Sequence, residues 1–286
     1  MGIIIHINTF QLNGGMFRVN ESRQMRPLIE LISLKGKLAL ITGAASGIGK
    51  AIAHRFGEAG ASLELVDVNE DLLNAISHEL TRQGIQARSH VVDLAQKEAI
   101  DRLWTEHLPK PPDILVNNAG IYPFKKFVEI DEAFLEHVMH VNFSSVFWMC
   151  QHMIQQRTGI GGIIINIGSI EAILPFKEEL THYNSSKGGV IALTRALAKD
   201  YGNAGFKINA IIPGGIMTPG TKNAAKEILK LKFGLIKSGI DFKNRLPIGR
   251  FGSPDEVALM AVVLATDLSS YVHGSLIPVD GGFLSA

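Results

Sequence analysis

Residues 38–49 read LALITGAASGIG, a short apolar run followed by a turn rich in glycine. The run Leu38–Ile41 has the composition of a buried strand, and the residues after Gly47 have the pattern of a helix. Gly43, Gly47 and Gly49 permit a tight turn and let backbone N–H groups approach a pyrophosphate, an anion that the N-terminus of a helix also favours. The stretch therefore predicts a dinucleotide-binding unit, although its spacing is G-x-x-x-G-x-G and not the commoner G-x-G-x-x-G.

The alternation of apolar runs with amphipathic stretches continues along the rest of the chain. The predicted strands are Leu38–Ile41, Ser62–Val66, Ala87–Val92, Ile114–Val116, Ile163–Ile167, Lys207–Ile211 and Ser275–Val279. The predicted helices are Gly47–Ala59, Asp71–Arg82, Gln96–His107, Asp131–Gln156, His182–Tyr201 and a last helix that Ser253 caps. Apolar strands with few polar residues are buried on both faces, and helical connections make them parallel. The fold class is therefore α/β, a doubly wound, mostly parallel sheet with helices on both faces, which is a Rossmann fold, in a single domain.

Two segments fall outside this alternation. Residues 1–33 are expected to form an irregular or disordered N-terminal arm, and the Rossmann-fold domain covers residues 34–286. Within the arm, the apolar run Ile3–Ile7 is too short for the core of a signal peptide. Residues 216–246 carry scattered lysines among apolar positions, and we interpret this amphipathic insertion as a lid.

Composition narrows the class of partner. The 286 residues carry a formal net charge of +1 and no long basic run, so a small molecule is expected as the partner, not nucleic acid or a membrane. The one cysteine, Cys150, is interpreted as a core residue; it excludes an internal disulfide and suits a reducing, cytoplasmic location. The ten histidines include no H-E-x-x-H motif, so no metal site is expected.

A second stretch, residues 168–189, reads GSIEAILPFKEELTHYNSSKGG and carries groups suited to proton transfer. Tyr183 and Lys187 are four residues apart, so on a helix they lie on one face. An ammonium beside a phenol favours the phenolate, so we expect Lys187 to lower the pKa of Tyr183 below its usual value of about 10. Ser169 ends the apolar run Ile163–Ile167, at the carboxyl end of a predicted strand, where open α/β sheets bind ligands. A tyrosine and a lysine at this spacing are also common on helix surfaces, so the pair alone does not identify a site.

Asp67 lies at the end of the second predicted strand. A carboxylate there can accept hydrogen bonds from the ribose hydroxyls of an adenosine, and its charge repels a 2′-phosphate. Residues 44–46 of the glycine-rich turn, Ala-Ala-Ser, offer no base for that phosphate. NAD is therefore favoured over NADP as the cofactor. The alternative is an aspartate that only caps the next helix, before Asn69.

These motifs occur with others in one order along the chain. They are Thr42-Gly43-x-x-x-Gly47-x-Gly49, Asn117-Asn118-Ala119-Gly120, Ser169, Tyr183-x-x-x-Lys187 and Pro213-Gly214. Together they resemble the short-chain dehydrogenase/reductase family in its compact, single-domain form, from about Leu34 to Gly282. The distance from Ser169 to Tyr183 is slightly longer than is usual in the family. Gly168 has no hydroxyl and cannot replace Ser169, so the assignment stands.

The resemblance implies roles for these residues. Tyr183 is implied to be the catalytic acid/base, and Ser169 to hydrogen-bond the reacting oxygen. Lys187 is implied to hold the nicotinamide ribose, and Asn142 to hold a water that links Lys187 to solvent. The residues implied to bind the cofactor are Gly43, Ser46, Gly47, Ile48, Gly49, Asp67, Val68, Asp93, Leu94, Asn118, Ala119, Gly120, Tyr183, Lys187, Pro213, Gly214, Ile216 and Thr218. The residues expected to contact the substrate are Ser169, Glu171 and Tyr183, and Asn117 is expected to stabilise the central sheet.

The implied activity is NAD-dependent interconversion of a secondary alcohol and a ketone by hydride transfer. A sugar or polyol is the first expectation for the substrate, because residues 182–189 and Glu171 resemble bacterial glucose dehydrogenases of the family. Residues 247–282 resemble 3-oxoacyl-carrier-protein reductases equally well, but such enzymes usually take NADPH, and Asp67 counts against that. A protein of another class, a non-catalytic NAD-binding sensor or scaffold, typically loses the tyrosine or the lysine, and both are present here.

Members of the family are usually homotetramers, paired through the two long helices after the fourth and fifth strands. An apolar excess beyond one face of the first of these helices is consistent with a partner. It comes from Phe143, Val146, Phe147 and Met149. The lid and the residues around Tyr122, Phe124, Glu171 and Phe176 are expected to select the substrate.

Overall fold

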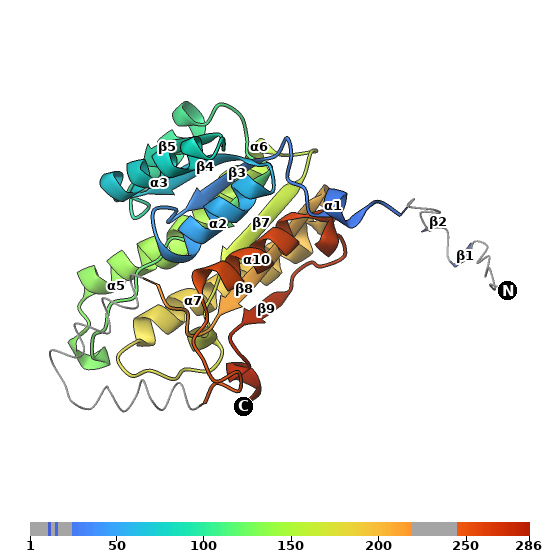
Figure 1. Ribbon diagram of the computed structural model, residues 1–286. Helices are drawn as coiled ribbons and strands as arrows, with labels where there is room; N and C mark the ends of the chain where they lie inside the picture. The colour runs from blue at the N-terminus through green and yellow to red at the C-terminus, as the bar shows by residue number, and fades with distance from the viewer. Residues whose placement is uncertain (1–10, 13–14, 17–24, 219–244) are drawn as a thin grey trace.

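The centre of the molecule is a sheet of seven strands in the order β5-β4-β3-β6-β7-β8-β9 (Figure 1). The structure is a computed structural model that describes residues 11–12, 15–16, 25–218 and 245–286. The strands are β3 (Leu38–Thr42), β4 (Ser62–Asp67), β5 (Ala87–Val91), β6 (Ile114–Asn117), β7 (Gly162–Ile167), β8 (Phe206–Pro213) and β9 (Leu276–Val279). All neighbouring pairs in this sheet are parallel, so the predicted doubly wound parallel sheet is confirmed.

The strand order reverses at β3. The chain runs outward from β3 through β4 to β5 and then returns to place β6 on the other side of β3. Ile41 pairs with Val116 in this register, so the loops that follow β3 and β6 leave the same edge side by side. A crevice forms at such a reversal, outside the carboxyl ends of the strands, and ligands bind there.

Two layers of helices cover the sheet. One face is covered by α2 (Gly47–Glu58), α3 (Glu70–Arg82) and α10 (Pro254–Ala265), and Figure 1 shows α2 and α10 side by side. The other face is covered by α4 (Lys97–Arg102), α5 (Glu132–Met139), α6 (Ser145–Gln156) and α7 (Thr181–Tyr201). Alternate side chains of β3 point to opposite faces, so Ile41 belongs to the core under α2 and Leu40 to the core under α6.

The long helix predicted over Asp131–Gln156 is interrupted. Between α5 and α6 the chain forms a π-helical turn, η3 (His140–Ser144), with Asn142 at its centre. The predicted helix Gln96–His107 is likewise shorter, because α4 passes into a second π-helical turn, η1 (Leu103–His107). Such turns often lie at functional sites. The hydrogen bonds of Asn142, described below, supply a reason for the first one.

Several short elements complete the chain. Within the predicted N-terminal arm, the structure describes a pair of antiparallel two-residue strands, β1 (Gln11–Leu12) and β2 (Gly15–Met16), and a one-turn helix, α1 (Leu28–Leu31). Short 3-10 helices are η2 (Phe127–Glu129), η4 (Ile170–Ala172), η5 (Gly202–Ala204), η6 (Asp267–Ser269) and η7 (Phe283–Ser285). Most of the predicted lid, residues 219–244, and the remainder of the arm lie outside the described residues.

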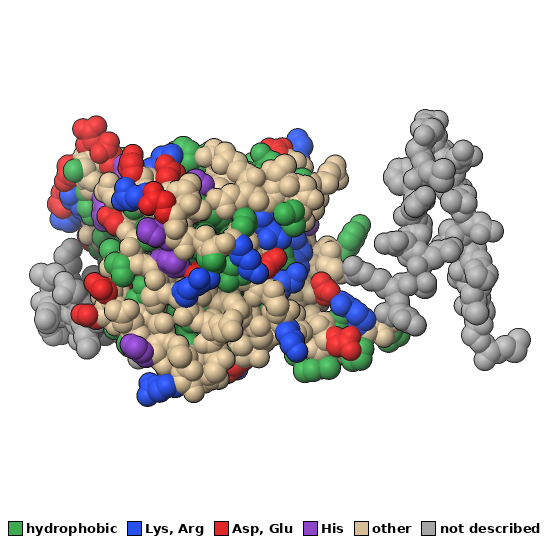
Figure 2. Space-filling view, turned by 90° about the horizontal axis from the view of Figure 1, so that it is seen from above, with side chains coloured by type: hydrophobic (Ala, Val, Ile, Leu, Met, Phe, Trp, Pro, Cys, Tyr) green, Lys and Arg blue, Asp and Glu red, His purple; other side chains and the backbone are tan. Residues whose placement is uncertain are grey.

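Acidic and basic side chains are interspersed on the face shown in Figure 2. This agrees with the small net charge of +1. Within the part of the chain that the structure describes, none of the helices combines the length and the apolar character needed to cross a membrane.

Candidate active site

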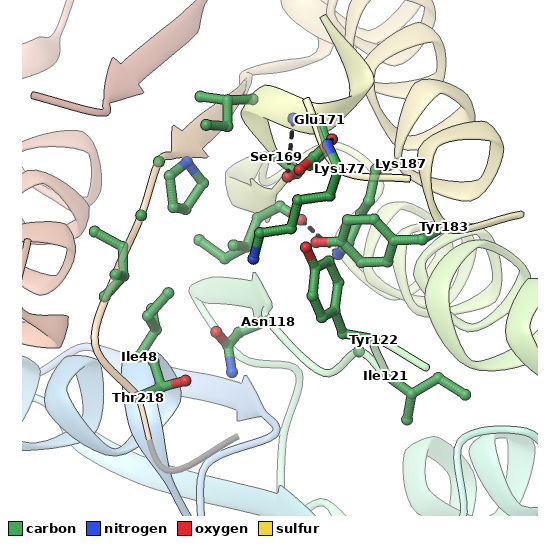
Figure 3. Close-up of a pocket in the computed structure, with 18 of the residues that line it drawn as sticks. Ile48, Asn118, Ile121, Tyr122, Ser169, Glu171, Lys177, Tyr183, Lys187 and Thr218 are labelled. Atoms are coloured by element: carbon green, nitrogen blue, oxygen red, sulfur yellow. Dashed lines mark hydrogen bonds between the residues drawn. The ribbon is translucent and has the colours of Figure 1, made fainter. Parts of the chain in front are cut away.

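A cavity of about 1040 Å³ opens at the carboxyl ends of β6, β7 and β8. The predicted site residues that line it are Ile48, Asn118, Gly120, Ser169, Glu171, Tyr183, Lys187, Pro213, Gly214, Ile216 and Thr218. Figure 3 shows side chains from several elements converging on this space. Segments that the sequence identified by separate motifs therefore meet at one place.

The glycine-rich turn is locked to the loop after β6. Asn118 Nδ2 donates to the carbonyl oxygens of Thr42 and Gly43 at 3.0 Å each. Thr42 Oγ1 accepts from the backbone N–H groups of Asn118 at 3.0 Å and Ala119 at 3.1 Å. A Cβ atom added at Gly49 would lie 2.1 Å from the Gly43 carbonyl oxygen. Gly43 itself has φ +63°, a conformation that residues with a side chain rarely adopt, so both positions require glycine.

The start of α2 fits the phosphates of a dinucleotide. Its N-cap residue, Ser46, is exposed, and among the described residues it gives the helix no side-chain capping hydrogen bond. The backbone N–H groups of Gly47 and Ile48 therefore head the helix, where the dipole favours an anion. A cradle of glycines beside such a helix end leaves room for the backbone to approach a pyrophosphate.

Asp67 lies next to this turn, at the end of β4 and outside the cavity. Its Oδ2 accepts from the backbone N–H of Ala45 at 3.0 Å, and its Oδ1 accepts from that of Asn69 at 3.0 Å. The N-cap of α3 is Asn69, whose side chain accepts from Leu72 N at 3.0 Å. Because each carboxylate oxygen has two lone pairs, Asp67 can still accept hydrogen bonds from a ribose.

Three other residues that the resemblance implied to bind the cofactor also lie outside the cavity. Val68 is exposed, and Leu94 is buried in the core under α4 and α6. Asp93 follows β5, and its Oδ1 accepts from the backbone N–H of Ala95 at 2.9 Å. Since β3, β4 and β5 are neighbours, these residues lie along one edge of the sheet with the glycine-rich turn.

Ser169, Tyr183 and Lys187 meet inside the cavity (Figure 3). Ser169 follows β7, and the other two lie one turn apart on α7, as their spacing predicted. The Ser169 hydroxyl hydrogen-bonds the Tyr183 phenol. Lys187 Nζ donates to the carbonyl oxygen of Ile167 at 2.9 Å. A hydroxyl, a phenol and an ammonium around one space can hold an alcohol or carbonyl oxygen and exchange a proton with it.

The prediction that Lys187 lowers the pKa of Tyr183 is wrong. Burial raises the pKa of Tyr183 to about 12; the hydrogen bond with Ser169 opposes this, and the charge of Glu171 adds to it. Burial also lowers the pKa of Lys187 to about 8, because an ammonium is poorly solvated there. The helix does place both side chains on one face, but desolvation is the largest influence on the pKa of each of them.

Asn142 is fully buried and fixes a wall of the cavity. Its Oδ1 accepts from Ile121 N at 2.8 Å, and its Nδ2 donates to Ile121 O at 2.9 Å and to Ser186 Oγ at 3.2 Å. A Cβ atom added at Gly120 would lie 3.3 Å from Asn142 Oδ1 and 3.4 Å from Lys187 Nζ. Asn142 therefore lies beside Lys187 and holds the loop between them. The water that Asn142 is implied to hold stays a prediction.

Lys177 lines the cavity, although no motif indicated it. It lies in the segment between Ser169 and Tyr183, whose extra length is the one signal in the sequence that a further side chain could reach the site. Its backbone N–H donates to Glu171 Oε2 at 3.4 Å, and that of Phe176 donates to the same oxygen at 2.9 Å. Burial raises the pKa of the Glu171 carboxyl.

Cys150 is a core residue, as predicted. Asn117 Nδ2 donates to its Sγ at 3.3 Å and to Asn166 Oδ1 at 2.9 Å, so Asn117 joins β6 to β7. Burial raises the pKa of Cys150 to about 12. Among the described residues, no group of three or more His, Cys, Asp or Glu side chains is placed to hold a metal ion.

The family model, the relatives and the solved structure that this chain resembles are all named as reductases or dehydrogenases. A family model described as enoyl-(acyl carrier protein) reductase matches residues 43–284. The 3-oxoacyl-(acyl-carrier-protein) reductase FabG of Aquifex aeolicus is 34% identical over 258 residues, which cover 88% of this chain and 98% of that protein. The 2-dehydro-3-deoxy-D-gluconate 5-dehydrogenase of Bacillus subtilis is 35% identical over 265 residues, covering 90% and 98%. The crystal structure of L-sorbose reductase from Gluconobacter frateurii, complexed with NADPH and L-sorbose, is similar with a TM-score of 0.82 at 31% identity, covering 90% of this chain and 99% of that one.

Proposed function

The chain belongs to the short-chain dehydrogenase/reductase family, and its relatives include oxidoreductases named for reactions at CH–OH or keto groups. We propose that it interconverts a secondary alcohol and a ketone on a sugar or polyol. The observation that supports this most strongly is the meeting of Ser169, Tyr183 and Lys187 in a cavity that also reaches Ile48 of the dinucleotide-binding turn. Relatives named for a keto-deoxygluconate and for L-sorbose support the substrate class. The test is a screen of sugars and polyols in which NADH absorbance is followed.

The nicotinamide dinucleotide, when bound, supplies the acceptor or the donor of the hydride. In alcohol oxidation, we propose that the Tyr183 phenolate takes the proton of the substrate hydroxyl while Ser169 Oγ hydrogen-bonds the same oxygen. In ketone reduction, the Tyr183 phenol returns a proton to that oxygen. Lys187 would hold the ribose hydroxyls on the nicotinamide side. Asn142 fixes the loop beside Lys187.

We propose that NAD is the preferred dinucleotide and that Asp67 selects it. The carboxylate lies at the end of β4, beside the turn that would receive the phosphates. A 2′-phosphate placed there would meet a negative charge, and Ala44, Ala45 and Ser46 carry no cation to offset it. The related L-sorbose reductase was solved with NADPH, so selection between the dinucleotides has to be measured for this chain.

Replacing Asp67 with Asn is expected to lower the ratio of kcat/KM for NAD to that for NADP by about tenfold or more, because the repulsion of the 2′-phosphate is removed. Asparagine has the same shape and keeps one of the two oxygens, so one of the hydrogen bonds from Ala45 and Asn69 is retained and the other is lost. Asp71→Asn is the matched control, since Asp71 is an exposed carboxylate four residues away. An unchanged ratio in Asp67→Asn would show that Asp67 does not select the cofactor.

Alcohol oxidation is expected to accelerate as pH rises from 7 to 10, whereas ketone reduction is not. Oxidation requires the Tyr183 phenolate, whose pKa is about 12, so its fraction grows with pH throughout this range. Reduction requires the protonated phenol, which dominates below pH 12. The measurement is kcat in both directions at saturating substrate and dinucleotide. An oxidation rate that is already level at pH 7 would contradict the assignment of this pKa to the working enzyme.

A 3-oxoacyl-(acyl-carrier-protein) reductase is the second candidate, supported by the Aquifex aeolicus relative. Reduction of a 3-oxoacyl thioester, with NADPH favoured and polyols unused, would establish it. A non-catalytic NAD-binding sensor is the third, and the presence of Tyr183 and Lys187 together in the cavity counts against it. Folded protein that binds NAD but turns over neither class of substrate would support the sensor.

We propose that residues 34–286 form one catalytic domain that assembles as a homotetramer in the cytoplasm. Of the four apolar residues predicted to extend beyond one face, Val146 and Met149 are buried in the core of their own chain, so they do not contribute to a surface. Phe147 is 38% exposed on α6 and remains the support for a contact there. Light scattering coupled to size-exclusion chromatography measures the assembly.

A further inference from the structure

Few of the side chains that line the cavity are acidic or basic. Within the described ranges they are Lys177, Glu171, Lys187 and His137. His137 is exposed at the rim, on α5. Lys187 donates to the Ile167 carbonyl oxygen, at the wall behind Tyr183. Glu171 accepts from two backbone N–H groups of its own loop.

Lys177 is different because its ammonium has no oxygen partner among the described residues. It lies over two aromatic rings, with Nζ 5.4 Å from the ring centre of Tyr122 and 6.0 Å from that of Phe124. The side chain is half-buried, and Figure 3 shows it extending into the open part of the pocket. Burial lowers the pKa of Lys177, and the charge of Glu171 opposes that effect.

The ammonium is also close to the proposed catalytic tyrosine. Tyr122, over whose ring it lies, packs edge-on against Tyr183 with ring centres 4.6 Å apart. The backbone that carries Lys177 is fixed, since Glu171 Oε2 accepts from the N–H groups of Phe176 and Lys177. A molecule whose reacting oxygen lies at Tyr183 would therefore reach Lys177 with another part of its chain.

The chemistry of that other part follows from the ammonium. An ammonium removed from water is unfavourable unless it is paired, and a carboxylate pairs with it through charge-assisted hydrogen bonds in which donor and acceptor carry opposite charges. A neutral polyol offers only hydroxyl dipoles to this position. Glu171 offsets only part of this cost. Its charge raises the pKa of Lys177, but its Oε2 accepts from two backbone N–H groups of its own loop, and no ion pair joins the two side chains among the described residues.

This inference rests on the proposed function and specifies its substrate class. We propose that Lys177 determines specificity by binding the carboxylate of the substrate, so the preferred substrates are polyhydroxy acids and their keto acids, not neutral polyols. The carboxylate lies at Lys177 while the carbon that is oxidised lies at Ser169 and Tyr183. Lys177 takes no part in the proton transfer itself.

The test uses pairs of compounds that differ in one terminal carbon, a carboxylate in one and a CH₂OH group in the other. The pairs are D-gluconate and D-glucitol, D-galactonate and galactitol, and glycerate and glycerol, each assayed with saturating NAD. The wild-type enzyme is expected to favour the acid of the pair that it uses. Lys177→Met is expected to lower kcat/KM for the acid by about tenfold or more through KM, and to leave the neutral compound within about threefold. Lys177→Arg is expected to retain the preference for the acid.

Lys126→Met is the matched control, because Lys126 is an exposed lysine paired with Glu129 at 3.3 Å and does not line the cavity. It is expected to behave as the wild type with both members of a pair. Equal use of the acid and the neutral compound by the wild type would overturn the proposal. So would an equal loss for both members in Lys177→Met, since that result indicates a structural role.

A binding measurement separates failure of this inference from failure of the proposed function. The Tyr183→Phe protein is saturated with NAD and titrated with both members of each pair in a calorimeter, so no turnover is needed. The role of Lys177 is supported if Tyr183→Phe binds an acid more tightly than its neutral counterpart and the double variant Tyr183→Phe/Lys177→Met does not. This holds even if the wild type oxidises none of the compounds. Equal binding of each pair, or binding of none, overturns it.

Discussion

The Tyr183→Phe variant is expected to turn over its substrate about 10²- to 10⁴-fold more slowly than the wild type, which is the usual contribution of a positioned acid/base. The substitution removes one oxygen and leaves the ring. That ring packs edge-on against Tyr122 on the cavity wall, so the shape of the site is preserved. Affinity for the dinucleotide is expected to stay nearly the same, because the glycine-rich turn and the start of α2 are untouched.

The measurement combines kcat with the dissociation constant of NADH, followed by its fluorescence. Tyr201→Phe is the matched control, since it removes the same oxygen from the other end of α7, where the ring contacts Phe206. It is expected to keep wild-type turnover. A Tyr183→Phe enzyme that retains most of its rate would exclude this phenol as the acid/base and with it the proposed proton transfer.

Local patterns were sufficient to predict most of the fold. The strand Leu38–Thr42 is buried along its whole length, and a continuous apolar run is the expected sequence of such a strand. The helix that carries Tyr183 and Lys187 begins at Thr181, one residue before its predicted start, because a periodic pattern over 21 residues leaves little freedom in its placement. The sequence specifies best the elements whose burial follows a simple pattern, which is continuous in this strand and periodic in this helix.

The interruption of the helix at Asn142 could not be predicted in the same way. At the interruption, the Asn142 side chain forms a pair of hydrogen bonds with Ile121, which is 21 residues away along the chain. Nothing in the residues around Asn142 indicates that partner. The same holds for Asn118, whose amide ties the turn after β3 to the loop after β6 across 75 and 76 residues.

The pKa of Tyr183 shows where local geometry misleads. The spacing of Tyr183 and Lys187 correctly placed two side chains on one face, but the pKa depends on solvent, and burial comes from the whole fold. Burial raises the pKa of the phenol and lowers that of the ammonium, so each group is pushed toward its neutral form. Lys177 was missed for a related reason, since a lysine in a loop has no pattern, and only the packing of that loop brings it to the cavity.

Gly49→Ala is expected to weaken dinucleotide binding by about 100-fold and to lower the free energy of unfolding by about 1–3 kcal/mol, the usual cost of added volume in a packed site. The new methyl group would lie 2.1 Å from the Gly43 carbonyl oxygen and 2.5 Å from Asn118 Nδ2. Neither contact can be relieved by rotating a flexible side chain, because the carbonyl is backbone and the Asn118 amide is held by hydrogen bonds to Thr42 and Gly43. The turn must therefore open, and the N–H groups at the start of α2 move away from the phosphates.

The measurement is the dissociation constant of NADH together with thermal unfolding. Gly57→Ala is the matched control, since it adds the same methyl group to the same helix, where the closest atoms belong to the side chain of Ile85 at 2.6 Å. That side chain is only partly buried and can shift, so dinucleotide affinity is expected to match the wild type. If Gly49→Ala bound NADH as tightly as Gly57→Ala, the turn after β3 would not be the phosphate site, and the dinucleotide would have to enter the crevice from another side.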